Sequence, residues 1–186
     1  RIIFYPSAKQ GAYTTPETVT TIGEKVFTQK TGLTEITIGK NVTEIGSFAF
    51  NGCTNLEKVT FADGGTEGLV ISNEAFANCS KLTEVNLPVR LVSISAGAFR
   101  SCRAITEIVI PEGVESIGAE AFQWCSSLVR VSLPKTLSSL GYTESGSELY
   151  MYVFRYCNAL EEINVASDNA SFYSDNGVLY GNTEGV

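Results

Sequence analysis

The sequence of 186 residues contains no histidine, and this absence excludes the common arrangements for nucleophilic catalysis. Ser-His-Asp triads and Cys-His pairs both need an imidazole that takes the proton of the nucleophile. The sequence also lacks the Gly-rich loops that hold nucleotide phosphates. We therefore expect a protein that is not an enzyme and that uses no cofactor.

Positive charge is scarce, since 13 lysine and arginine residues stand against 20 acidic residues and the net charge is −7. No run of basic residues is dense enough to follow a phosphate backbone, so nucleic acid is not an expected partner. No apolar run approaches the roughly 20 residues that a membrane-spanning helix needs. The start, RIIFYPSAKQ, lacks the apolar region of a signal peptide. We expect this segment to stay out of the membrane and its start to have been trimmed.

The sequence does contain an internal repeat. The stretch SNEAFANCSKLTEVNLP at 72–88 returns at 95–111 as SAGAFRSCRAITEIVIP, and at 118–134 as GAEAFQWCSSLVRVSLP. Six copies align on one aromatic position, which holds Phe27, Phe50, Phe76, Phe99, Phe122 and Phe154. The spacing is nearly constant but wider before Phe76 and widest before Phe154, so two copies carry insertions. A period of about 23 residues indicates a repeat architecture.

Each copy predicts two short strands and one helical turn. The segment L-x-x-I-x-I places apolar residues two positions apart, as at Val131 and Leu133, which is the period of a strand with one buried face. The segment V-x-x-I, as at Val114 and Ile117, fits a second short strand, and GAEAF at 118–122 suits a helical turn. A unit of this length cannot bury its apolar face alone, so neighbouring units must stack. The sequence predicts a β-rich solenoid of six stacked repeats with a parallel sheet and short helical turns.

The repeat resembles the BspA-like leucine-rich repeats of bacterial surface proteins, whose units read L-x-x-I-x-L-P-x-x-V-x-x-I-G-x-x-A-F-x-x-C. The stretch ITEIVIPEGVESIGAEAFQWC at 105–125 matches this form nearly position for position. The resemblance implies a leucine-rich-repeat solenoid in a secreted or cell-surface bacterial protein that acts in adhesion to host or neighbouring cells. It also implies one domain, 1–186, in which six repeats at 19–165 lie between partial hairpin arms at 1–18 and 166–186, as part of a longer array.

One cysteine follows the aromatic residue by three positions in five consecutive copies, at Cys53, Cys79, Cys102, Cys125 and Cys157. In a stack these side chains form a column and do not converge on one point, which disfavours a zinc site. Neighbouring strands lie about 4.8 Å apart, so distance alone leaves a disulfide open. The odd number of cysteines and the apolar character of the thiol favour reduced side chains in the core.

Six charged side chains share one register on the outer face of the predicted sheet: Glu35, Lys58, Glu84, Glu107, Arg130 and Glu162. Lys58 and Arg130 can each pair with acidic neighbours on both sides, which leaves Glu84 and Glu107 as adjacent like charges. Two carboxylates at that separation also suggest a retaining glycosidase. An open, repeated surface offers no cleft to separate their pKa values, so a solvated ladder of charges is the favoured interpretation.

The longest insertion separates Leu140 from Phe154 and carries Tyr142, Tyr150 and Tyr152. Insertions in a solenoid map to loops on one face, often the binding face, and tyrosine is favoured at contact surfaces. Alternatively, Tyr150 and Tyr152 cover the edge of an enlarged core. These tyrosines and the six charged residues together form the candidate binding surface.

We therefore expect a monomeric, non-enzymatic module that binds a protein or glycan on a host or bacterial surface. The alternative is a spacer or scaffold that presents another domain of the same protein. An appended catalytic domain in the full-length protein would favour the spacer, and a surface anchor would favour adhesion.

Overall fold

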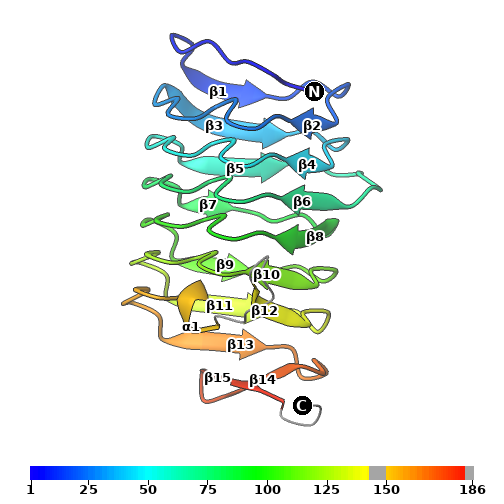
Figure 1. Cartoon of the computed structure of the whole chain (residues 1–186), viewed down its shortest axis with the longest axis vertical. Coiled ribbons are helices and arrows are strands. Elements are labelled where there is room, and N and C mark those ends of the chain that lie inside the picture. Colours follow the sequence, from blue (N-terminus) through cyan, green and yellow to red (C-terminus); the bar gives the residue numbers. More distant parts are fainter. Residues whose placement is uncertain (143–149, 183–186) are drawn as a thin grey trace.

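The computed structural model describes residues 1–142 and 150–182. Its strands run in parallel ladders along one axis, and each repeat forms one turn of a solenoid (Figure 1). The L-x-x-I-x-I segments and the strand before them form β1 (Gly11–Thr14), β3 (Leu33–Ile38), β5 (Lys58–Phe61), β7 (Glu84–Val85), β9 (Glu107–Val109), β11 (Arg130–Leu133) and β13 (Glu162–Val165). We call the outer side of these strands the strand face. The predicted leucine-rich-repeat solenoid with its parallel sheet is confirmed.

The V-x-x-I segments form a second parallel ladder, of six strands. These are β2 (Thr21–Ile22), β4 (Glu44–Ile45), β6 (Leu69–Ile71), β8 (Leu91–Ile94), β10 (Ser116–Gly118) and β12 (Ser139–Tyr142). Close packing explains why glycine ends the V-x-x-I-G motif. At Gly118 a Cβ atom would lie only 2.5 Å from the backbone nitrogen of Ala96 in the preceding repeat. Neighbouring turns of the backbone therefore approach closely at this corner.

The core is a column of phenylalanine rings between the ladders. Rings of successive repeats stack with centroids 4.7 to 5.8 Å apart and planes within 12° of parallel. The rings of the first five repeats, Phe27, Phe50, Phe76, Phe99 and Phe122, are fully buried. Offset stacking at these distances is the favourable geometry for aromatic pairs, so each ring completes the packing of the next.

The third side of the solenoid consists of turns, and the helical turn predicted at GAEAF is wrong in the first five repeats. The turns occupy 24–29, 47–52, 73–78, 96–101 and 119–124, and we call this side the turn face. The residues two positions before and after each phenylalanine have positive φ, as at Glu120 (61°) and Trp124 (64°). A left-handed residue breaks the α-helical path. In the sixth repeat α1 (Tyr150–Val153) forms a single turn.

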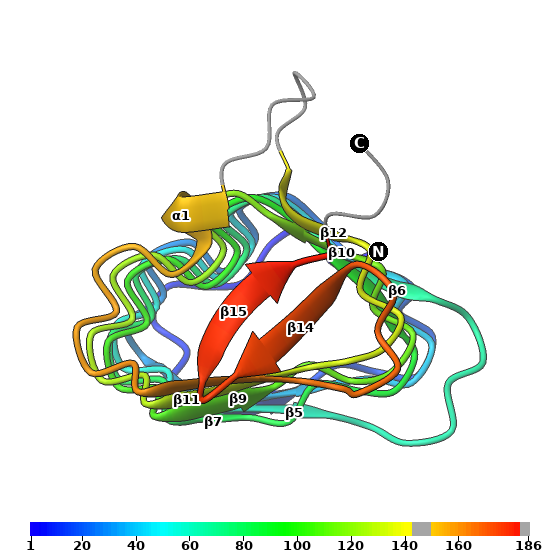
Figure 2. The same ribbon diagram turned by 90° about the horizontal axis from the view of Figure 1, so that it is seen from below.

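Alternate N–H groups of each turn bond to the following repeat. The N–H of Phe50 donates to the carbonyl of Ala75 (2.7 Å), and the N–H of Phe99 donates to the carbonyl of Ala121 (2.8 Å). Intervening N–H groups bond within their own repeat, as that of Cys102 does to the carbonyl of Phe99 (3.2 Å). The turn face is thus a third hydrogen-bonded ladder, and Figure 2 shows the closed outline that the three sides form. Among the described residues, no helix is long and apolar enough to cross a membrane.

The strand face is divided between β7 and β9. Its strands form one sheet in the order β1-β3-β5-β7 and another in the order β9-β11-β13. Backbone bonds link the repeats on either side, as from Thr83 to Glu57 (3.0 Å) and from Val129 to Thr106 (2.8 Å). On the two sides of the division Glu84 and Glu107 hold equivalent positions of their repeats. Like charges directly opposite one another destabilise a strand pair.

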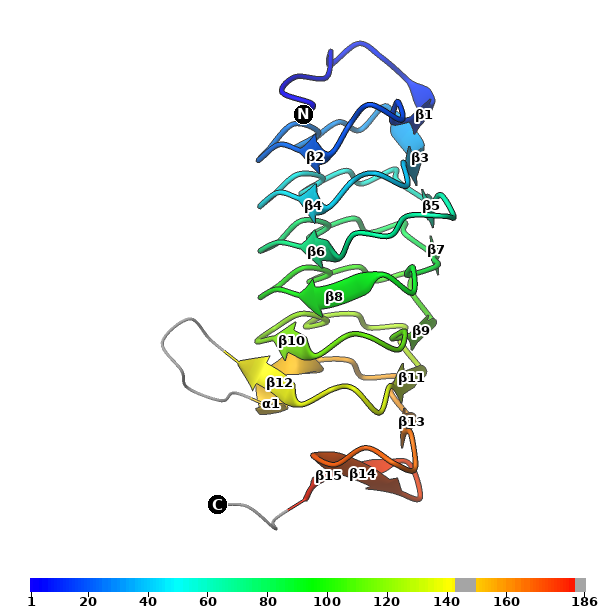
Figure 3. The same ribbon diagram turned by 90° about the vertical axis from the view of Figure 1, so that its right-hand side faces the viewer.

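The C-terminal end of the core is covered by an antiparallel hairpin of β14 (Phe172–Asp175) and β15 (Val178–Gly181) (Figures 2 and 3). Buried Asn169 holds its start: the side-chain amide donates to the carbonyls of Pro134 (2.7 Å) and Leu137 (2.9 Å). Its oxygen accepts the N–H groups of Ser171 and Phe172, both at 2.8 Å. The hairpin is thereby fixed to the segment 134–137, where the fifth repeat passes into the sixth.

Replacing Phe99 with Ala tests the ring column. The substitution removes a fully buried ring between Phe76 and Phe122, and we expect the free energy of unfolding to fall by about 3 to 5 kcal/mol. Urea denaturation followed by circular dichroism measures this change. Tyr173→Ala, at a ring that is 47% exposed, is the control and should change little. Equal effects of the two substitutions would contradict the importance of the column.

Candidate binding surface

The structure brings the six charged residues into one column on the strand face. Glu35 lies opposite Lys58 and Lys58 opposite Glu84, while Arg130 lies opposite both Glu107 and Glu162. Such alignment follows from the parallel ladder, in which equivalent positions of successive repeats meet. The sequence-based register is therefore the register of the folded chain, except across the division between β7 and β9.

Each basic residue of the column forms an ion pair with one acidic neighbour. The ammonium nitrogen of Lys58 lies 2.6 Å from Glu84, and Nε of Arg130 lies 3.3 Å from Glu162. The hydrogen bond and the negative charge of Glu84 raise the pKa of Lys58. No ion pair of Glu35 or Glu107 occurs in the described part of the chain, so the expected two-sided pairing is only half formed. These exposed pairs contribute little to stability and leave the charges available to a ligand.

A hollow of about 400 Å³ lies at the division of the strand face, where Glu84, Asn86, Glu107 and Val109 line it. The two carboxylates considered as a glycosidase pair thus stand on the two separated sheets. Val109 is 57% exposed, so the hollow opens on the surface.

The five cysteines form a buried column of free thiols. Each Sγ lies within hydrogen-bonding distance of the carbonyl oxygen of the phenylalanine in the preceding repeat, as in Cys102 to Phe76 (3.1 Å) and Cys157 to Phe122 (3.1 Å). Burial raises the pKa of Cys53 to about 12 and that of Cys157 to about 11. Within residues 1–142 and 150–182, no group of three or more cysteine or acidic side chains is placed to hold a metal ion. The thiols therefore act as core packing and as donors to backbone carbonyls.

The raised thiol pKa values predict a loss of stability at high pH. Above about pH 9 the cysteines of the unfolded chain release protons, whereas the folded chain keeps them until pH 11 to 12 at Cys53 and Cys157. The stabilisation is complete below pH 9 and decreases as the pH rises through that range. Urea midpoints at pH 8, 9.5 and 10.5 measure it. The Cys53→Ala/Cys157→Ala variant should show a shallower decrease, and an identical slope would rule the thiols out as its cause.

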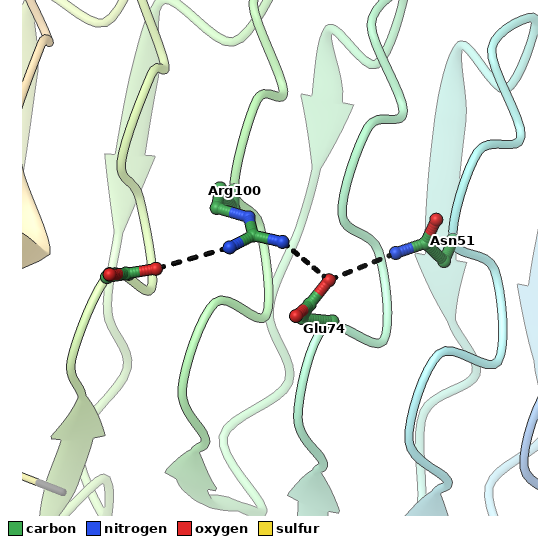
Figure 4. A network of polar contacts seen from close by, with 4 residues as sticks. Asn51, Glu74 and Arg100 are labelled. Atoms are coloured by element: carbon green, nitrogen blue, oxygen red, sulfur yellow. Dashed lines mark hydrogen bonds and ion pairs between the residues drawn. The ribbon is translucent and has the colours of Figure 1, made fainter.

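The turn face carries a polar network of its own (Figure 4). The guanidinium of Arg100 bonds to Glu74 (2.8 Å) and to Glu120 (3.2 Å), which belong to the preceding and following repeats. Glu74 also accepts a bond from the amide of Asn51 (3.3 Å). A hollow of about 390 Å³ borders Glu74, Arg100 and Glu120. Each of the four residues has a partner in a neighbouring repeat, so the network fixes four repeats to one another.

The three tyrosines of the insertion are only partly placed. Tyr142 ends β12 and Tyr150 begins α1, but their side chains lie outside the described residues. Tyr152 is partly buried, and the guanidinium carbon of Arg155 lies 5.0 Å from its ring centroid. The proposal that these tyrosines bind a ligand therefore rests on Tyr152 and on sequence.

An exposed aromatic cluster on the turn face was not predicted from the sequence. Trp124 and Tyr156 stack with centroids 4.0 Å apart and planes 20° from parallel. They are 42% and 38% exposed. The guanidinium of Arg155 lies 4.7 Å from the centroid of Tyr156. A signal for the pair does lie in the sequence, because both rings stand two positions after the repeated phenylalanine.

Comparison with known proteins identifies relatives of the repeat. A sequence model described as the BspA type leucine rich repeat region matches residues 2–68 and 66–176, in six copies. No curated protein matches the chain.

Solved structures of bacterial repeat proteins share the fold. The pneumococcal vaccine antigen PcpA is 26% identical with a TM-score of 0.80, over 96% of this chain and 46% of its own. A leucine-rich repeat protein from Bacteroides ovatus is 35% identical with a TM-score of 0.67, over 82% and 39%. A leucine rich cell surface protein from Faecalibacterium prausnitzii is 27% identical with a TM-score of 0.63, over 95% and 52%. The chain thus spans about half or less of each.

Proposed function

Because this chain belongs to the BspA-type leucine-rich repeat family, we propose that it is a non-enzymatic binding module of a secreted or cell-surface bacterial protein. Its ligand is a protein or glycan on a host or neighbouring cell, and the module serves adhesion. Two structural relatives support this location, one described as a vaccine antigen and the other as a cell surface protein.

The column of charges on the strand face carries the proposal. Six charged side chains occupy equivalent positions on two parallel sheets, with Glu35, Lys58 and Glu84 in register on one and Glu107, Arg130 and Glu162 on the other. A rigid surface loses little conformational entropy on binding, so more of the contact energy appears as affinity. The pattern of acidic and basic positions favours a ligand of complementary charge pattern and disfavours others. We include Tyr142, Tyr150 and Tyr152 in the proposed surface as a second contact.

The test is direct binding of the folded chain to immobilised matrix proteins and to a glycan array. We expect the folded chain to bind at least one of these proteins or glycans. The Lys58→Gln/Arg130→Gln variant should bind the same ligand at least tenfold more weakly. The matched control is Lys81→Gln/Arg103→Gln, which removes two exposed positive charges elsewhere on the surface. The control should bind like the natural chain.

Two outcomes would contradict the proposal. If the folded chain retains no protein or glycan, the spacer function is favoured instead. If both double variants lose binding equally, net charge and not the strand face governs the interaction. Thermal unfolding of each variant establishes that the compared proteins are folded.

A further inference from the structure

The aromatic cluster on the turn face belongs to a column with one position in each repeat. Two residues after the stacked phenylalanine, the successive repeats carry Gln29, Gly52, Asn78, Ser101, Trp124 and Tyr156. The backbone aligns them, since the N–H of Ser101 donates to the carbonyl of Gln123 (2.7 Å) and that of Trp124 to the carbonyl of Arg155 (2.9 Å). Rings fill this column in the last two repeats, and small or polar residues fill it in the others.

One face of the indole is left open by this arrangement. Tyr156, from the following repeat, covers one face of Trp124 at 4.0 Å. The other face turns toward the preceding repeat, where the equivalent residue is the small Ser101. Trp124 is 42% exposed even though Tyr156 covers one of its faces. The uncovered face is therefore accessible to solvent. Each repeat advances the stacked phenylalanine rings by 4.7 to 5.8 Å, so the place beside Trp124 has room for one group of the thickness of a ring.

Two polar side chains of the same column and the indole N–H have no hydrogen-bond partner in the part of the chain that the structure describes. Among the described residues, the Ser101 hydroxyl, the Asn78 side-chain amide and the indole N–H of Trp124 form no hydrogen bond within the chain. The Asn78 amide can donate hydrogen bonds through its nitrogen and accept them through its oxygen, and the Ser101 hydroxyl can both donate and accept. A ligand in this place would therefore meet an aromatic face on one side and hydrogen-bonding groups at its rim.

We propose that a neutral hexopyranose unit of a glycan stacks on the free face of Trp124, level with Ser101. A pyranose in its chair form presents C–H groups on one face, which suit the negative face of an aromatic ring, and hydroxyls around its edge. This inference rests on the proposed binding function and names the ligand class of one surface. A cationic ligand fits less well, because the guanidinium of Arg155 already lies against the other ring of the stack.

Trp124 is the only tryptophan in the chain, so its signals report on this place alone. Methyl β-D-glucopyranoside and methyl β-D-galactopyranoside are titrated into the full chain while the indole N–H resonance and the tryptophan fluorescence are followed. We expect at least one sugar to shift both signals with saturation. Sorbitol, which has the hydroxyls of a hexose without the ring, should not, and an equal response to sorbitol would overturn the proposal.

Two variants test the geometry. Ser101→Phe places a ring in the proposed sugar position, at a backbone φ of 61° close to the 64° of Trp124. The indole signals should then no longer change when sugar is added. If they still change, the sugar does not stack at the proposed position. Trp124→Ala should weaken binding to a glycan that the natural chain retains by at least tenfold. Tyr173→Ala removes an exposed ring that stacks on Tyr180 (5.0 Å) in the hairpin and should leave binding unchanged.

The outcomes separate this inference from the proposed function. If the chain binds a macromolecule but Trp124→Ala binds it equally and no sugar shifts the indole, the sugar place is wrong and the binding function stands. If tetramethylammonium shifts the indole signals and neither sugar does, the ligand at this place is a cation and not a hexose. That result also overturns the inference. If no macromolecule and no sugar binds, both fail.

Discussion

Backbone hydrogen bonding between neighbouring repeats is the constraint on which the rest of the structure depends. On all three sides of the solenoid, N–H groups of one repeat bond to carbonyls of another, as from Phe50 to Ala75 and from Val129 to Thr106. A repeat by itself would leave these groups unpaired and its apolar residues exposed. Alignment in register is therefore enforced, and each position of the repeat becomes a column along the axis.

The columns explain why residues of different kinds recur at fixed positions. Phenylalanine supplies stacked rings that fill the centre, and each cysteine adds a small apolar side chain whose thiol bonds to the carbonyl of the preceding phenylalanine. On the outside the same alignment brings charges together, so that Arg100 joins Glu74 and Glu120 across three repeats. The strand face is divided between Glu84 and Glu107, and a hollow that both carboxylates line opens there.

Much of the fold and of the strand-face column followed from periodicity. The two apolar residues of L-x-x-I-x-I and the recurring phenylalanine were sufficient to predict the strands and their stacking. They also predicted the register of the charged residues within each of the two sheets, but not the break between them. The turn face was mistaken for helix, because GAEAF has good helix formers but its φ angles are decided by bonds to the next repeat. Trp124 and Tyr156 were missed because they lie in different repeats, far apart along the chain, and meet only through stacking.

The sequence by itself determined the solenoid, the positions of its core residues and the absence of imidazole chemistry, since these depend on residue type and on a period that every copy repeats. Tertiary structure decided where the regularity fails and which side chains are left free. The division between β7 and β9, the pairing of Lys58 with Glu84 alone, and the open face of Trp124 all depend on how particular neighbours compete for contacts in three dimensions. Such competition leaves no period in the sequence.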